Sequence, residues 1–244
     1  MDRSLLKRRA QEIVVTSNPR MITVGLVYLI IVIVLDALGS RVMSVNISQS
    51  EAMNYLNYVA DGNLDYALSY ARSMEPPPTA YLINFALKLV TGVVSAGFVI
   101  FVLNTIRGTK PCFGNLLDGF GCAGRVILLR ILTGLFVWLW GLLLVVPGVI
   151  AYYRYSQALY ILLDDPRKSP LQCIRESRAL MEGHKKELFL LDLSFLGWIL
   201  LGAIPYIGYA VRVWSVPYIA TAKALFYERL RGNTVWSYTP QFPV

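Results

Sequence analysis

The sequence predicts an all-α protein: a polytopic bundle of about six transmembrane helices with an internal two-span repeat and short amphipathic interfacial helices. Composition is the first reason, because 56% of the 244 residues are hydrophobic and 16% are charged. Soluble domains have about 25% charged and about 45–50% apolar residues. The second reason is that several apolar runs approach the roughly 20 residues that cross a bilayer.

The positions of the basic residues are the third reason. The net charge of +8 comes largely from Lys and Arg in short segments beside the apolar runs. This is the positive-inside pattern, and it does not suggest a nucleic-acid-binding face. It predicts a protein of the plasma membrane with both termini in the cytoplasm and residues 44–80 outside.

Residues 1–20 form a basic amphipathic leader, which we expect on the cytoplasmic membrane surface with Leu6 and Val14 among its apolar contacts. Residues 21–107 hold the first two spans and the extracytoplasmic loop 44–80. We expect two short helices in this loop.

A two-span repeat is predicted for the rest of the chain, with spans three and four in residues 108–165 and spans five and six in residues 166–230. The fourth span is short, and each pair turns at a proline. Residues 231–244 form a cytoplasmic tail. Superposing the two copies aligns four pairs of uncommon residues: Trp140 with Trp198, Pro147 with Pro205, Arg154 with Arg212 and Tyr160 with Tyr218.

Four charged side chains fall inside predicted spans at a similar depth, about 10 Å from the outer end at roughly 1.5 Å per residue. One interpretation is an outward-facing polar cavity that attracts an anion or a lipid headgroup, with a glutamine on its wall. The other is that the long side chains reach the membrane surface and the carboxylate neutralises one of them. The residues of this predicted site are Asp36, Lys88, Arg154, Gln157 and Arg212.

Nearer the cytoplasm, Arg130 in the third span and Asp192 in the fifth predict a structural ion pair. Lys223 is expected to reach the inner membrane surface. Three scattered cysteines and the single His184 lack metal-ligand spacing, so we predict no metal and no cofactor. The sequence also lacks a recognisable catalytic motif.

Two stretches carry a family resemblance. They read SRALMEGHKKELFLLDLSFLGW at 177–198 and VPYIATAKALFY at 216–227, and PGVIAYYRYSQALYILLDDP supports them. They resemble the domain-of-unknown-function 975 family of bacterial integral membrane proteins over most of residues 110–230. The resemblance implies six spans and implies no activity.

We therefore expect a non-enzymatic, membrane-embedded binding or accessory protein. Its expected partners are membrane lipids and an anionic small molecule or lipid headgroup, and a homo-oligomer is compatible with the sequence. One alternative is a solute transporter, supported by the short fourth span and by Pro217 in the sixth. A lipid-acting membrane enzyme is a weaker alternative, because Asp36 with two arginines is a poor acid–base set.

Overall fold

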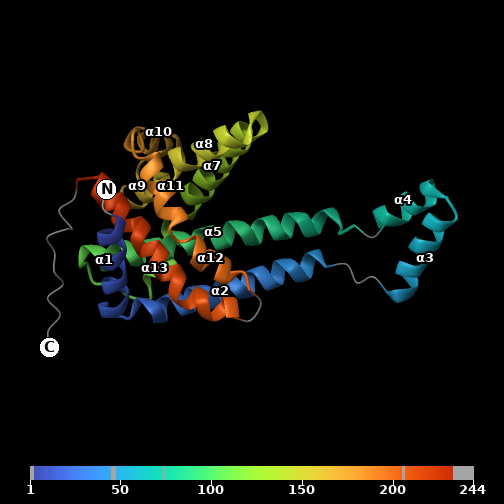
Figure 1. The fold of residues 1–244 in the computed structure, drawn as a ribbon, viewed down its shortest axis with the longest axis horizontal. Helices are drawn as coiled ribbons and strands as arrows, with labels where there is room; N and C mark the ends of the chain where they lie inside the picture. The colour runs from blue at the N-terminus through green and yellow to red at the C-terminus, as the bar shows by residue number, and fades with distance from the viewer. Residues whose placement is uncertain (1–2, 45–47, 74, 205–206, 233–244) are drawn as a thin grey trace. The chain divides into compact units, whose positions relative to one another are not determined.

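The computed structural model describes residues 3–44, 48–73, 75–204 and 207–232, and every regular element within these ranges is a helix. The predicted all-helical class is therefore confirmed for this part of the chain (Figure 1). The chain divides into two compact units, residues 32–91 and residues 1–31 with 92–244. The long helices α2 (Met21–Met43) and α5 (Pro78–Arg107) contribute to both.

The unit of residues 32–91 contains α3 (Gln49–Ala60) and α4 (Leu64–Ser73), the two short helices expected in the loop. A capping box starts α3: the Ser48 amide donates to Glu51 Oε2 at 2.7 Å, and the Glu51 amide donates to Ser48 Oγ at 3.3 Å. Gly62, at a φ of +71°, reverses the chain between the two helices.

In the other unit, α1 (Arg3–Thr16) packs against α13 (Ile207–Leu230). Leu6, Ala10 and Val14 lie one helical turn apart and are fully buried. The apolar stripe that we expected on the membrane surface is therefore covered by protein. Leu5, on the flank of this stripe, stays 51% exposed.

Among the residues that the structure describes, three helical segments are long and apolar enough to cross a membrane: Met21–Met43, Pro78–Arg107 and Asn115–Leu143. The last of these comprises the short helices α6 (Asn115–Asp118) and η1 (Gly119–Cys122) followed by α7 (Ala123–Leu143). These helices support the prediction of a membrane protein. The six-span bundle and the internal repeat remain predictions.

The predicted fourth and fifth spans are each divided into two helices. The fourth becomes α8 (Val145–Tyr155) and α9 (Ala158–Asp164), and the fifth becomes α11 (Lys185–Leu193) and α12 (Leu196–Gly202). A single helix, α13, covers the predicted sixth span, but it carries Arg212, Lys223 and Glu228 within its apolar sequence.

The chain reverses between α7 and α8 at Leu144, whose backbone is extended, and Pro147 lies within the first turn of α8. The two helices then pack closely, since a Cβ on Gly148 would lie 2.9 Å from the Cα of Gly141. The corresponding turn at Pro205 lies outside the described residues. The predicted tail 231–244 is described only as far as residue 232.

Between these segments, α10 (Pro170–Leu180) starts with a capping box formed by Ser169 and Gln172 and packs against α7, α8 and α9. Its Cys173 and Ser177 are fully buried. The core of this unit is formed by large side chains from several helices, among them Met21, Phe101, Leu129, Leu162, Phe195, Phe226 and Tyr227.

Candidate functional site

A cavity of about 850 Å³ lies in the unit that contains α7 to α13. Most of its wall is apolar or aromatic, as in known ligand pockets of roughly 300–1,000 Å³. Its charged lining residues are Arg130 on α7, Asp192 on α11 and Lys223 on α13. Neutral polar groups come from Ser95, Thr133, Tyr152, Tyr155, Ser156, Gln157 and Tyr160.

The charged groups are fixed by contacts with one another and with hydroxyl groups. Lys223 Nζ lies 3.0 Å from Asp192 Oδ1, and the Tyr153 hydroxyl donates to Asp192 Oδ2 at 3.3 Å. Arg130 Nη2 donates to Ser95 Oγ on α5 at 3.0 Å. The structure thus places the predicted pair, Arg130 and Asp192, on one cavity wall and gives each a different partner. Lys223, which we expected at the membrane surface, is the cation that pairs with Asp192.

A break in the helical chain brings Gln157 to the cavity. Helix α8 ends at Tyr155 and α9 begins at Ala158, so two backbone groups lose their helical partners. Ser177 of α10 replaces both bonds: its hydroxyl donates to the Arg154 carbonyl at 2.9 Å and accepts from the Gln157 amide at 3.2 Å. The buried hydroxyl therefore fixes the orientation of the residues on either side of the break.

The side chain of Gln157 is almost fully buried, with 2% of the residue exposed. Its amide nitrogen donates to Ser156 Oγ at 3.0 Å. Its carbonyl oxygen, Oε1, has no hydrogen-bond partner in the described structure. Buried acceptors normally have a partner, so an acceptor at a cavity wall is a group that a ligand can satisfy.

The other residues of the predicted site are distributed over both units. Asp36 and Lys88 belong to residues 32–91, where Lys88 Nζ donates to Asp36 Oδ1 at 2.6 Å. Arg154, Gln157 and Arg212 belong to the second unit. The structure brings Asp36 and Lys88 together, and a cavity that joins all of these residues remains a prediction.

Neither Arg154 nor Arg212 lines the cavity. Arg212 Nε donates to the Gly202 carbonyl at 3.2 Å, where it closes the C-terminal end of α12. Arg154 is half-buried in the last turn of α8, its carbonyl accepts from Ser177, and its Nε has no hydrogen-bond partner in the described structure. The two arginines that the predicted repeat aligned therefore have different local roles.

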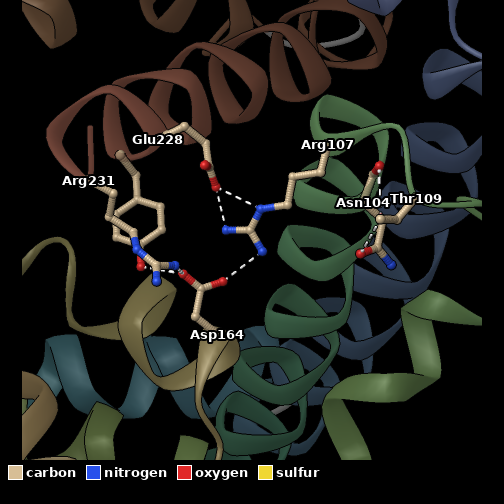
Figure 2. A network of polar contacts seen from close by, with 7 residues as sticks. Asn104, Arg107, Thr109, Asp164, Glu228 and Arg231 are labelled. Carbon is tan, nitrogen blue, oxygen red and sulfur yellow. Dashed lines mark hydrogen bonds and ion pairs between the residues drawn. The ribbon is translucent and has the colours of Figure 1, made fainter. Parts of the chain in front are cut away.

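A charge cluster at the ends of α5, α9 and α13 was not predicted from the sequence (Figure 2). The guanidinium of Arg107 points between Glu228, to which its Nε donates at 2.8 Å, and Asp164, whose Oδ1 lies 2.7 Å from Nη1. Tyr227 and Arg231 both donate to the other oxygen of Asp164. The side chain of Glu228 is 1% exposed, so the cluster is a buried structural feature that links the ends of three helices.

A sequence signal for this cluster exists, because each of its acids lies at the inner end of a predicted span, where acids are uncommon. The sequence does not say which cation each acid meets. His184 lies 3.3 Å from Glu187, and the described residues contain no group of His, Cys, Asp and Glu that could hold a metal ion. Burial raises the pKa of the Cys173 thiol on α10, as expected for a packing residue.

Comparison with known proteins identifies the family of the C-terminal part of the chain. Residues 141–234 match the family model described as Protein of unknown function (DUF975). The resemblance predicted from residues 177–198 and 216–227 is therefore confirmed, and this segment belongs to that family. No curated protein and no solved structure matches the chain.

Proposed function

We propose that this protein is a membrane-embedded binding protein that holds a ligand in the cavity next to Gln157 and does not transform it chemically. The observation that carries the proposal is the buried, unpartnered Oε1 of Gln157, a residue that lines a cavity of about 850 Å³. A ligand with a hydrogen-bond donor would satisfy this oxygen, and an anionic ligand would be attracted to the wall, which carries two cations and one carboxylate.

The contacts of Asp192 favour binding over catalysis. Its carboxylate is held by Lys223 and Tyr153, an arrangement typical of a structural ion pair. A general base must be free to approach a substrate proton. In this proposal Asp192 keeps Lys223 in place and leaves the remaining polar groups for the ligand.

By the predicted topology, Arg130, Asp192 and Lys223 lie toward the cytoplasmic ends of their segments. The proposed site is therefore in the inner half of the membrane, whereas the sequence alone suggested the outer third. Gln157 is the one residue that the two sites share.

A cavity-filling variant tests the proposal. Gly134 on α7 lines the cavity, and a Cβ built on it meets nothing within 4 Å. Gly134→Leu should fill part of the cavity without disturbing the backbone. Gly124→Leu is the matched control, because it lies on the same helix, also meets nothing within 4 Å and does not line the cavity.

The measurement is native mass spectrometry of the protein purified from membranes, together with its thermal unfolding in detergent after addition of a mixture of polar phospholipids. We expect Gly134→Leu to show less bound mass and less lipid-dependent stabilisation than the wild type. Gly124→Leu should behave like the wild type in both measurements. Equal bound mass and equal stabilisation in all three proteins would rule out the cavity as the binding site.

Solute transport is a second proposal, favoured by the breaks between α8 and α9 and between α11 and α12. Divided helices at a binding site are typical of many transporters. This function requires substrate-dependent flux in proteoliposomes, and Gly134→Leu should stop that flux. A binding protein without transport activity would retain ligand in the same vesicles and show no flux.

A further inference from the structure

The cavity carries one more cation than carboxylate, and this excess lies at Arg130. Of the residues that line the cavity, Arg130 and Lys223 are cations and Asp192 is the acid. Asp192 neutralises Lys223 at 3.0 Å, whereas the partner of Arg130 is the neutral hydroxyl of Ser95. Arg130 is an exposed residue, and a guanidinium whose partner is a neutral hydroxyl keeps its charge available to an anion.

Gln157 adds a second requirement for the ligand. An amide oxygen can only accept hydrogen bonds, so the ligand must present a hydroxyl or an amine to Oε1. The amide nitrogen of the same side chain is already used by Ser156. The ligand that fits both groups therefore has an anion and a hydrogen-bond donor in one polar end.

The rest of the cavity suggests where this polar end comes from. The wall contains apolar side chains of α5, α7 and α13, and its exposed aromatic members are Trp138, 63% exposed, and Tyr152, 51% exposed. On α7 the neighbouring Leu135, Leu139 and Leu142 are also exposed. In a helix long and apolar enough to cross a membrane, such a surface faces lipid. The mouth of the cavity is thus continuous with an apolar surface.

We infer that the cavity binds the headgroup of a monoanionic lipid that carries hydroxyl groups, of the phosphatidylglycerol type. The phosphate would lie against Arg130, a headgroup hydroxyl would donate to Gln157 Oε1, and the acyl chains would leave past Trp138 and Tyr152. This inference rests on the proposed function and names its ligand class. Soluble glycerol phosphate shares the polar chemistry and lacks the chains that the apolar wall would contact.

The test uses the full-length protein in detergent and measures its affinity for four probes by native mass spectrometry. They are phosphatidylglycerol; phosphatidylmethanol, which has the same charge and no headgroup hydroxyl; phosphatidylcholine, which is zwitterionic; and glycerol 1-phosphate. We expect phosphatidylglycerol to bind most tightly, phosphatidylmethanol less tightly and phosphatidylcholine most weakly. Glycerol 1-phosphate should not displace phosphatidylglycerol.

Variants assign each preference to a residue. Arg130→Leu should lower the affinity for both anionic lipids about tenfold or more, as expected for loss of a charge-assisted hydrogen bond. The affinity for phosphatidylcholine should not change. Gln157→Leu should remove the preference for phosphatidylglycerol over phosphatidylmethanol. Arg178→Leu, at an exposed cation of α10 outside the cavity, should bind as the wild type does.

Arg130→Gln is a second variant at this position in case the leucine protein does not fold, since it removes the charge and keeps a donor for Ser95. Equal affinity for the anionic lipids and phosphatidylcholine would overturn the inference and leave the proposed function intact. Displacement of phosphatidylglycerol by glycerol 1-phosphate would show that the site recognises the polar group alone and would overturn the assignment of a lipid ligand. If none of the cavity variants, Gly134→Leu included, lost lipid binding, the proposed function itself would be overturned.

Discussion

The two divided segments, α8–α9 and α11–α12, solve the same problem in different ways. Each break frees backbone groups that a continuous helix would satisfy, and a side chain from a remote part of the chain binds them. At the first break the side chain is the buried hydroxyl of Ser177. At the second it is the ammonium group of Lys7 on α1, which donates to the Ser194 carbonyl at 3.2 Å and lies 4.9 Å from the centre of the Phe195 ring.

The difference shows which break is fixed and which is adjustable. Ser177 is fully buried and makes both bonds from one atom, so water cannot replace it. The bond from Lys7 is exposed and can be exchanged for water. The fixed break is the one next to the cavity, where Gln157 needs a defined position.

The largest expected effect comes from removing the hydroxyl at the first break. Ser177→Ala leaves the Arg154 carbonyl and the Gln157 amide buried without a partner, so the free energy of unfolding should fall by about 1–3 kcal/mol. Thermal unfolding in detergent measures the change. Ser194→Ala is the matched control at the second break, because the Ser194 hydroxyl donates within its own segment, to the Leu191 carbonyl. Equal losses of unfolding free energy in Ser177→Ala and Ser194→Ala would contradict the view that the first break is the better fixed of the two.

A smaller effect is expected at the second break. Lys7→Met keeps the apolar stem and removes the ammonium group, at a cost of about 0.5–1 kcal/mol. Unfolding measured at low and high salt checks this value. If Lys7→Met destabilised the protein more than Ser177→Ala, the first break would not be the better fixed of the two.

The accessibility of Cys173 reports on the same break. It lies one helical turn before Ser177 and is buried, whereas Cys112 is exposed. Because burial raises the pKa of the Cys173 thiol, less thiolate is present near neutral pH, and labelling should accelerate only as the pH rises above the usual range of cysteine.

Maleimide labelling followed by mass spectrometry measures the labelling rates of Cys112 and Cys173. Cys112 should react rapidly and Cys173 slowly, and Ser177→Ala should accelerate Cys173 alone. Unchanged labelling of Cys173 in that variant would show that Ser177 does not hold α10 against the break.

The smallest effect concerns a helix start that needs no remote residue. At α3 the backbone hydrogen bond from Ser48 lowers the pKa of Glu51 below its usual value. The cap should therefore contribute fully above the ordinary glutamate pKa and be lost as the pH falls through the lower, folded value. A titration of Glu51 by NMR measures this shift, and Ser48→Ala, which removes the side-chain hydrogen bond to Glu51 and keeps the backbone one, should reverse it in part. A pKa of Glu51 that is not lowered in the wild type would contradict the shift, and a pKa unchanged by Ser48→Ala would exclude the Ser48 side chain as part of its cause.

Local features of the fold could be predicted from the sequence, because their causes lie within a few residues. The α3 and α4 pair is confirmed, and so is the all-helical class. The breaks could not be predicted, since the apolar runs 149–163 and 188–204 read as continuous spans. The groups that bind the backbone at the two breaks are a hydroxyl on α10 and an ammonium group on α1, both on other helices.

The candidate site was predicted in part for the same reason. Gln157, Arg130 and Asp192 were singled out, because polar residues in apolar runs are conspicuous. Their partners were not, since Lys223 reads equally well as a residue at the membrane surface. The apolar stripe of α1 is similar: Leu6 and Val14 have the pattern of a membrane-surface helix, and α13 covers them.

The most direct test of the central claim is a structure determined in nanodiscs that contain phosphatidylglycerol. We expect density for a lipid headgroup in contact with both Arg130 and Gln157, with its chains leaving past Trp138. A cavity filled only by water, or headgroup density beside Asp36 and Lys88 in its place, would contradict the account.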